Sequence, residues 1–274
     1  MTGVLLLVSI LVCYSIISTK GYVEGLNMFE INRVGGIVWV GRPFLALRGI
    51  IAIFLLSTAK LEMVRVKSVY YFVTRASNWF TVLLACGEMG WLVYILNDLF
   101  SVFTQQYTMG YSTKSGIVIW FVSGVLSLLS PIEHSAVLNR VCRIEIIDYQ
   151  AVCASGTIYI GNFQRCCTLI GLAICVVVLC YFIERIQNPQ QKCDSRYSLL
   201  LSSPGRYMFE KKSWEVDNIY YLDKASAVIS GILSLQLRKQ LFIFDIKMWR
   251  FYTIDLSQYP SPQDTPLSSH FVLC

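Results

Sequence analysis

The sequence predicts an all-α membrane protein, with about five transmembrane helices and a small C-terminal region that contains β-strands or mixed α/β structure. Of its 274 residues, 55% are hydrophobic and only 15% are charged, and the mean hydropathy is +0.56. Soluble domains carry charge on about a quarter of their residues. The apolar residues also fall in continuous runs, close to the ~20 residues that a helix needs to cross ~30 Å of hydrocarbon.

Each apolar run is expected to form a helix. A transmembrane β-barrel is the other structure that satisfies its backbone in lipid, but its strands alternate apolar and polar residues. The predicted spans are 4–19, 44–59, 79–103, 116–132 and 166–183. They make up a predicted multi-pass transmembrane domain over 1–183, followed by a C-terminal cytosolic region, 184–259, and a disordered tail, 260–274.

The first two runs have alternative interpretations. The run 4–19 has the position and length of a cleaved signal peptide, but no basic residue precedes it and no small-residue cleavage site follows it. We therefore expect it to remain as a span. The second run begins with "GRPFLALR", where Arg42, Pro43 and Arg48 interrupt the apolar pattern. A re-entrant or interfacial segment that begins at Val34 is the alternative there.

Basic residues give little information on orientation, because Lys and Arg are equally numerous on the two sides of the predicted bundle. Locally, no charge precedes the first run and Lys20 follows it directly. This favours an N-terminus outside the cytosol. With five spans, the 133–165 loop is then also outside and the tail is in the cytosol.

Two of the ten cysteines lie in the loop between the fourth and fifth runs. Cys142 and Cys153 bound the segment "CRIEIIDYQAVC", and a β-like "GTIYIG" follows it. If this loop is extracytoplasmic, a disulfide between them is expected. The alternative is a pair of reduced thiols in a cytosolic loop. No histidine or second cysteine pair nearby completes a zinc set, so no metal site is predicted.

Two carboxylates, Glu88 and Asp98, lie inside the predicted span 79–103. A charge at mid-membrane costs about 2.5–3.5 kcal/mol on insertion scales and normally finds a partner. If the second and third spans form a hairpin, a rise of 1.5 Å per residue places Arg48 within roughly 3 Å of the depth of Glu88, and Arg42 level with Asp98. We predict these two intramembrane ion pairs. The alternative is a proton or cation path lined by both acids.

Small residues flank Glu88 in the sequence. Gly87 and Gly90 lack side chains, and such positions allow two helices to approach closely. The surroundings of Glu88 are therefore expected to pack against a neighbouring helix.

Motifs for catalysis are missing from the sequence. It has only two histidines, His134 and His270, and neither belongs to a nucleophile, metalloprotease or nucleotide-binding motif. We therefore expect no enzymatic activity and no cofactor. The net charge of +6 is spread over the loops, so no nucleic-acid partner is expected.

The expected function is a non-enzymatic one in the plasma membrane or an endomembrane, of scaffold, sensor or receptor-like character. Its partners would be the lipid bilayer and other membrane proteins or further copies of the chain. A transporter or channel that uses Glu88 and Asp98 is the alternative function.

The C-terminal third is more polar. Residues 241–252, "LFIFDIKMWRFY", have the aromatic and β-branched composition of a strand. Residues 225–237, "ASAVISGILSLQL", are too few to cross a membrane. The stretch "PSPQDTPLSSH" from Pro260 has the composition of a disordered segment.

Four segments carry a resemblance to a known family: "GRPFLALRGIIAIFLLSTA", "SNWFTVLLACGEMGWLVYILNDLF", "VCRIEIIDYQAVCASGTIYIGNF" and "LDKASAVISGILSLQLRKQLFIFDIKMW". Over 41–249 the chain resembles a family of uncharacterised multi-pass transmembrane proteins of oomycetes. The resemblance implies a membrane protein in which the cysteine-containing loop and "FDIKMW" recur. It implies no activity. Members of that family are longer, which implies that this chain is a short or truncated one.

Overall fold

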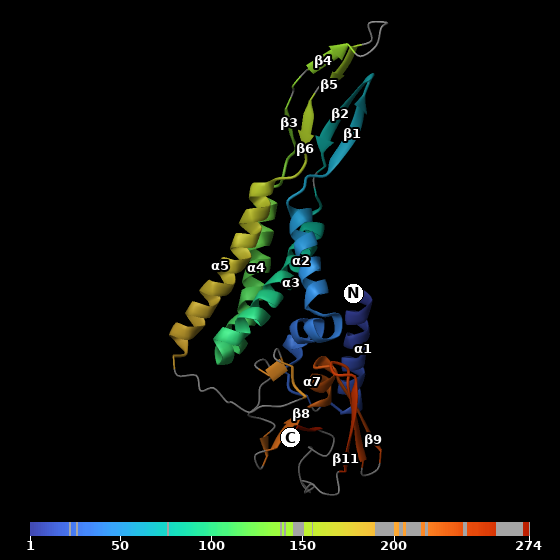
Figure 1. The fold of residues 1–274 in the computed structure, drawn as a ribbon, viewed down its shortest axis with the longest axis vertical. Coiled ribbons are helices and arrows are strands. Elements are labelled where there is room, and N and C mark those ends of the chain that lie inside the picture. Colours follow the sequence, from blue (N-terminus) through green and yellow to red (C-terminus); the bar gives the residue numbers. More distant parts are fainter. Residues whose placement is uncertain are drawn as a thin grey trace.

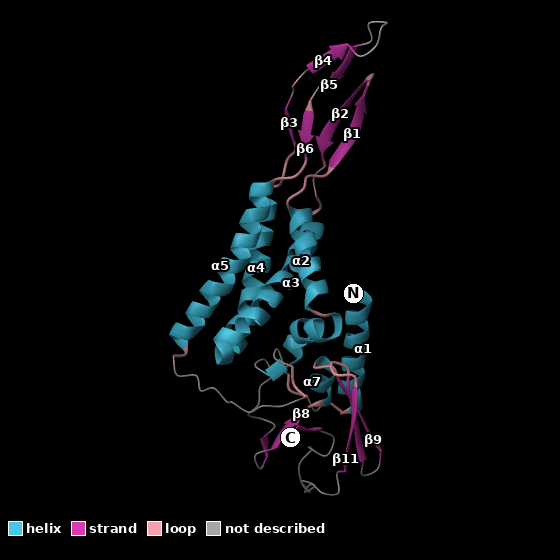
Figure 2. Cartoon of the chain, viewed as in Figure 1, coloured by secondary structure: helices cyan, strands magenta, loops and turns pink. Residues whose placement is uncertain are grey.

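A computed structural model describes most of the chain, and helices account for the larger part of it (Figures 1 and 2). The described residues are 1–21, 23–25, 27–75, 77–137, 139, 141–144, 151–154, 156–189, 200–202, 205–206, 215–216, 219–237, 240–255 and 271–273. Three parts follow one another along the long axis of the molecule in Figure 1: β-hairpins at one end, a helical bundle in the middle, and a mixed α/β assembly at the other end.

The bundle is formed by four helices, each of which packs against the next one in the sequence. These helices are α2 (Arg42–Leu56), α3 (Trp79–Thr104), α4 (Thr108–Leu129) and α5 (Phe163–Gln187). Neighbouring helices run antiparallel. In the α3–α4 pair, for example, a single 3₁₀ turn, η3 (Gln105–Tyr107), reverses the chain, and Trp120 Nε1 donates to the Leu83 carbonyl at 3.0 Å.

Local sequence signals set where these helices begin. The side chain of Asn78 accepts from Phe80 N at 3.1 Å at the start of α3, and that of Asn162 accepts from Arg165 N at 3.0 Å at the start of α5. Each satisfies a backbone donor that the helix leaves unpaired. α2 begins with Pro43 in its first turn, where the missing N–H costs nothing.

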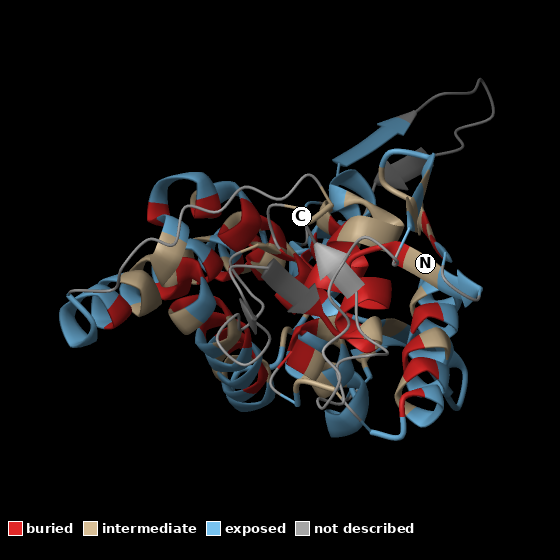
Figure 3. Cartoon of the chain, turned by 90° about the horizontal axis from the view of Figure 1, so that it is seen from below, coloured by how far each residue is buried: buried red, intermediate tan, exposed pale blue. Residues whose placement is uncertain are grey.

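Apolar side chains fill the bundle and also cover its outer surface. The core includes Ala52, Ile53, Met89, Val93, Tyr111, Ile119, Leu169, Ala173, Val176 and Val177. Large apolar side chains on the outside include Leu47, Phe54, Leu55, Leu84, Phe121, Leu179 and Phe182. In Figure 3 the helices are buried on their inward sides and exposed on their outward sides. An exposed apolar surface of this extent marks a site of contact with membrane lipid or with another protein.

Two helical stretches of the described chain are long and apolar enough to cross a membrane, Trp79–Leu129 and Phe163–Gln187. A third candidate is the pair Asn27–Val40 and Arg42–Leu56, which bends by 116° at its break. The predicted count of five spans is therefore not supported. The physical reasons are that α1 (Thr2–Ser18) has only 17 residues and α2 only 15, and that the chain turns at Gly41, where φ is +94°.

The hairpins project from one end of the bundle (Figure 1). The α2–α3 connection forms β1 (Leu61–Val66) and β2 (Val69–Thr74). The α4–α5 connection forms two antiparallel pairs, β3 (Ser135–Val137) with β6 (Thr157–Tyr159) and β4 (Val141–Ile144) with β5 (Ala151–Ala154). The two connections are joined at their base, where Ala59 N donates to the Ile160 carbonyl at 2.7 Å. The β-like "GTIYIG" is thus a strand, β6.

The opposite end carries what we call the terminal assembly, in which the N-terminal segment packs against part of the C-terminal region. It consists of α1, the 3₁₀ turn η1 (Asn27–Glu30), the π-helix η2 (Ile31–Val40), α7 (Lys224–Ile229), and a sheet of β9 (Ile232–Leu237), β10 (Gln240–Asp245) and β11 (Arg250–Asp255) in the order β11-β10-β9. Val8, Val12 and Val34 share one core with Ile229 and Ile243. The predicted boundary at residue 183 thus separates residues that pack together.

Two predictions for the C-terminal third need correction, one for residues 241–252 and one for the tail. Residues 241–252 are not one strand, because 246–249 turn the chain between β10 and β11. Residues 225–237 divide into α7 and β9 at Gly231, where φ is +76°. Within the predicted disordered tail, Phe271–Leu273 form β12, which pairs with β8 (Ile219–Leu222); β8 also pairs with β7 (Glu215–Val216). The rest of that tail lies outside the described residues.

Candidate functional site: paired charges and a buried polar seam

Arg48 and Glu88 lie opposite one another where α2 and α3 pack together. Arg48 Nε and Nη2 both donate to the Glu88 carboxylate. The guanidinium carbon of Arg48 also lies 5.6 Å from the ring centroid of Trp91. A bidentate contact of this kind is among the stronger charge-assisted hydrogen bonds. The arrangement neutralises an acid in the middle of α3.

Arg42 and Asp98 form the second contact between these two helices, with Arg42 Nε donating to Asp98 Oδ2. The Asp98 side chain is only 3% exposed, whereas that of Arg42 is 51% exposed. Asp98 Oδ1 is buried and has no hydrogen-bond partner within the described part of the chain. The structure thus brings together the two residue pairs that the helix-depth argument matched.

The glycine that allows α2 and α3 to approach is Gly49, on α2. A Cβ atom there would lie 2.8 Å from Leu92 N and 2.9 Å from Leu92 Cβ. The two glycines that flank Glu88 contribute less. A Cβ on Gly87 would meet only the Trp120 ring of α4, at 3.7 Å, and one on Gly90 would have nothing within 4 Å. The close contact between α2 and α3 near Glu88 therefore depends on the glycine of α2 and not on the two glycines of α3.

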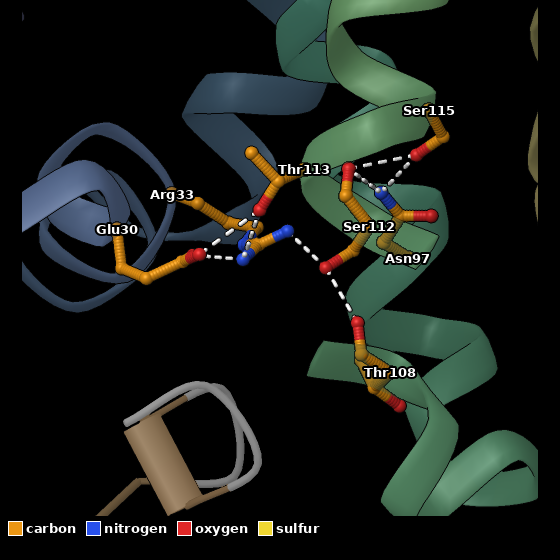
Figure 4. Close-up of polar contacts among 7 residues, drawn as sticks. All are labelled: Glu30, Arg33, Asn97, Thr108, Ser112, Thr113 and Ser115. Atoms are coloured by element: carbon orange, nitrogen blue, oxygen red, sulfur yellow. Dashed lines mark hydrogen bonds and ion pairs between the residues drawn. The ribbon is translucent and has the colours of Figure 1, made fainter. Parts of the chain in front are cut away.

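A larger polar cluster joins the bundle to the terminal assembly (Figure 4). We call it the polar seam, and it comprises Glu30, Arg33, Asn97, Thr108, Ser112, Thr113 and Ser115. Arg33 donates to the Glu30 carboxylate and to Ser112 Oγ, and Thr113 Oγ1 donates to Glu30 Oε1 at 2.9 Å. Glu30 and Arg33 are 7% and 3% exposed. A full ion pair is therefore enclosed between η1, η2 and α4.

Asn97 extends the polar seam onto α3. Its Nδ2 donates to Ser115 Oγ at 2.9 Å and to the Ser112 carbonyl at 3.3 Å. Ser112 Oγ in turn donates to the Thr108 carbonyl at 2.7 Å. Asn97 Oδ1 and Arg33 Nε are buried and have no partner among the described residues. The polar seam is thus connected but not fully satisfied.

One more buried acid links α4 and α5 at the same end of the bundle. Glu184, whose side chain is 5% exposed, accepts from Lys114 Nζ at 2.6 Å and from Asn188 Nδ2 at 2.7 Å. Together with Arg42–Asp98 and Glu30–Arg33, it forms what we call the charged belt. Every helix of the bundle contributes to the charged belt near the end that faces the terminal assembly.

Glu30, Arg33 and Glu184 were not predicted from the sequence as partners of buried charges. A signal for the first two was present: an acid and a base lie three residues apart directly before the apolar run 34–40, a spacing that allows an intrahelical pair. No signal placed them against α4. Lys114 and Glu184 are 70 residues apart, and nothing in the sequence matches their depths.

Cys142 and Cys153 face one another across β4 and β5, as direct partners in the antiparallel register. Residues opposite each other in such a ladder have Cα atoms about 4.5–5.5 Å apart, which lies within the range that a disulfide spans. The register is compatible with the predicted disulfide, which stays a prediction.

Of the two histidines, only His134 lies within the described residues. His134 Nδ1 makes a hydrogen bond of 2.6 Å with the hydroxyl of Thr74, and His270 lies outside the described residues. Within the described ranges, no three His, Cys, Asp or Glu side chains are placed to hold a metal ion.

Comparison of the chain with models of known protein families, with curated proteins and with solved structures finds no significant match. The resemblance to a membrane-protein family of oomycetes remains a prediction.

Proposed function

We propose that this chain is an integral membrane protein with a non-enzymatic role, of scaffold, sensor or receptor-like character. The observation that carries the proposal is the bundle surface: an apolar exterior lies between the charged belt at one end and polar connections to the hairpins at the other. A soluble protein that exposed this surface to water would aggregate.

The length of the apolar zone fits a bilayer. From the charged belt to the hairpin end, the helices run over 42–56, 79–98, 114–129 and 163–184. At a rise of 1.5 Å per residue these stretches are roughly 20–33 Å long, close to the ~30 Å of a hydrocarbon core. Because α3 and α4 pack antiparallel, the stretch Trp79–Leu129 would cross the membrane twice.

Paired charges favour a structural role over a conduction path. Glu88 and Asp98 each contact an arginine of α2, and the Asp98 oxygen that lacks a partner among the described residues, Oδ1, is buried. An acid that binds a transported cation instead presents its carboxylate oxygens to a water-filled cavity. Holding α2 and α3 together is therefore the better-supported role for the two ion pairs, Arg42–Asp98 and Arg48–Glu88. The parts available for interaction with partners are then the hairpins and the terminal assembly.

We place the hairpins outside the cytosol and the terminal assembly inside it. An extracytoplasmic compartment allows the predicted Cys142–Cys153 disulfide to form. Because α1 packs against α7, we place the N-terminus on the side of the C-terminal region, not on the opposite side as the count of five spans implied.

Two measurements test the proposal. The chain should stay in the membrane pellet after alkaline carbonate extraction, and its release into the supernatant would contradict the membrane assignment. Glycosylation acceptor sites then report the side in eukaryotic cells. We expect Lys67→Asn with Val69→Thr, at the β1–β2 turn, to give a glycosylated band, and Phe251→Asn, in β11, to give none. The reverse pattern would overturn the orientation and leave the membrane assignment standing.

A further inference from the structure

A cavity of about 700 Å³ lies where the bundle meets the hairpins. Its walls come from the C-terminal ends of α2 and α4, from β2, and from the N-terminal ends of α3 and α5. Ligand pockets in proteins typically occupy about 300–1,000 Å³. The cavity is therefore large enough to hold an organic ligand.

The lining has an apolar and a charged part. Among the described residues of the lining, the apolar side chains include Leu56, Phe72, Val82, Leu128 and Ile132, and the charged ones are Lys60, Arg75, Arg165 and Glu133. Three cations against one acid give the lining an excess of positive charge. Arg75 has Glu62 as a neighbour at 3.7 Å, but both are exposed, so that contact is weak.

Arg165 is the cation with unused hydrogen-bonding capacity. Its Nη2 donates to Ser127 Oγ at 3.2 Å, while its Nε is buried and has no hydrogen-bond partner in the described part of the protein. A guanidinium carries five N–H donors in a planar fork that suits phosphate and carboxylate oxygens. Because Nε is itself closed off, an anionic group in the cavity would accept from the terminal nitrogens of Arg165, of which Nη1 has no hydrogen-bond partner among the described residues.

We propose that this cavity binds an anionic amphiphile, with its phosphate group on Arg165, Lys60 and Arg75 and its hydrocarbon chain against the apolar wall. The inference that the ligand is a bilayer phospholipid rests on the proposed membrane location, because the cavity then lies at the depth of the lipid headgroups. The hydrocarbon wall distinguishes this ligand from free phosphate. Arg165 and its acceptors would tie the hairpin base to the bundle through the lipid.

The test uses the full-length protein in neutral detergent, with short-chain lipids that dissolve as monomers. Dihexanoyl phosphatidic acid and dihexanoyl phosphatidylcholine have the same chains and differ in net charge, and isothermal calorimetry measures each affinity. We expect the phosphatidic acid to bind about ten-fold more tightly, the effect of roughly one charge-assisted hydrogen bond. Inorganic phosphate alone should bind at least about ten-fold more weakly than phosphatidic acid, because it buries no chain.

Two arginines at opposite ends of α5 provide the matched variants. Arg165→Gln should lower the affinity for phosphatidic acid about ten-fold, whereas Arg185→Gln, at an exposed position in the last turn, should leave it unchanged. Lys60→Gln with Arg75→Gln, both exposed, should also weaken binding and does not depend on the folding of the Arg165 variant.

Equal affinity for the two lipids, equal affinity for inorganic phosphate, or unchanged binding in both the Arg165 and the Lys60/Arg75 variants would overturn the proposal. Release by alkaline carbonate combined with Arg165-dependent lipid binding would refute the membrane location alone, and the ligand would then be a soluble amphiphile.

Discussion

The bundle and the terminal assembly bury their residues in different ways. In the bundle, helices that follow one another in the sequence form the core, and its buried acids are neutralised by cations from another helix. In the terminal assembly, the core joins Val8 to Ile229 and Ile243, more than 200 residues away. Its buried aspartates are held mainly by near neighbours: Asp223 accepts from Ser226 N at 3.0 Å, and Asp245 pairs with Lys247 at 3.0 Å. Loss of a charge should therefore separate helices in the first region and disturb only a turn in the second.

The largest effect is expected at the polar seam, where the two regions meet. Glu30→Gln leaves the guanidinium of Arg33 buried without its carboxylate, and breaking a buried ion pair in this way costs about 3–5 kcal/mol. Glu62→Gln, at an exposed ion pair of β1, is the matched control and should cost less than about 1 kcal/mol. Denaturation in detergent monitored by circular dichroism measures both. Equal effects of the two variants would contradict the burial of the Glu30–Arg33 ion pair between the bundle and the terminal assembly.

The ion pair Arg48–Glu88 is the next test and depends on what surrounds the bundle. The two side chains are 21% and 37% exposed. In water, a pair this open contributes about 0–1 kcal/mol, but in hydrocarbon an unpaired charge costs about 2.5–3.5 kcal/mol. We expect Glu88→Gln to destabilise the protein by the larger amount in lipid nanodiscs.

Replacing both Arg48 and Glu88 distinguishes a structural ion pair from a transport site. Arg48→Met with Glu88→Met should recover much of the stability, because no unpaired charge remains. A double variant that folds well but loses a measured proton or cation flux would defeat the structural role and support the transporter alternative.

The same comparison explains what could be predicted from the sequence. Each helix of the bundle has its own apolar run, and a constant rise per residue matches depths along a hairpin, so Arg48–Glu88 and Arg42–Asp98 could be paired before the structure. The terminal assembly has no comparable signal. The run 4–19 is apolar whether it crosses a membrane or packs against α7, and its contacts lie at the far end of the chain. Likewise, Lys114 and Glu184 belong to α4 and α5. The relative depth of these two helices depends on the long connection between them, so it could not be calculated from the sequence.

The hairpins belong neither to the bundle nor to the terminal assembly, so a disulfide within one of them tests a third region of the molecule. A disulfide between Cys142 and Cys153 closes a loop of about a dozen residues and is worth about 2–3 kcal/mol by chain entropy. Cys142→Ser should lower the unfolding midpoint accordingly, whereas Cys175→Ser, at an exposed free cysteine of α5, should not. Mass spectrometry after alkylation without reductant checks the bond. Alkylation of both residues would exclude it.

Packing between α2 and α3 gives a smaller effect. Gly49→Ala places a methyl group against the backbone of Leu92, and overpacking of this kind typically costs about 1–3 kcal/mol. Gly171→Ala, on α5, meets nothing within 4 Å and should be neutral or stabilise the helix by up to about 1 kcal/mol. Thermal unfolding of both variants tests the contrast. A neutral Gly49→Ala would mean that the two helices can separate at little cost.

The smallest effect concerns Asp223, in the terminal assembly. Burial raises the pKa of its carboxyl group above the ordinary value, and hydrogen bonds from Ser226 and Asn27 oppose the rise. The folded protein therefore binds more protons than the unfolded chain between pH ~4 and the raised pKa, so this residue's contribution to stability is largest in acid and falls as the pH rises. The slope is at most about 1.4 kcal/mol per pH unit.

Asp223→Asn keeps an N-cap side chain for α7 and removes the titration, so the free energy of unfolding should fall less steeply with pH than in the wild type. If Asp223→Asn leaves this slope unchanged, the buried Asp223 does not act through its local surroundings as proposed.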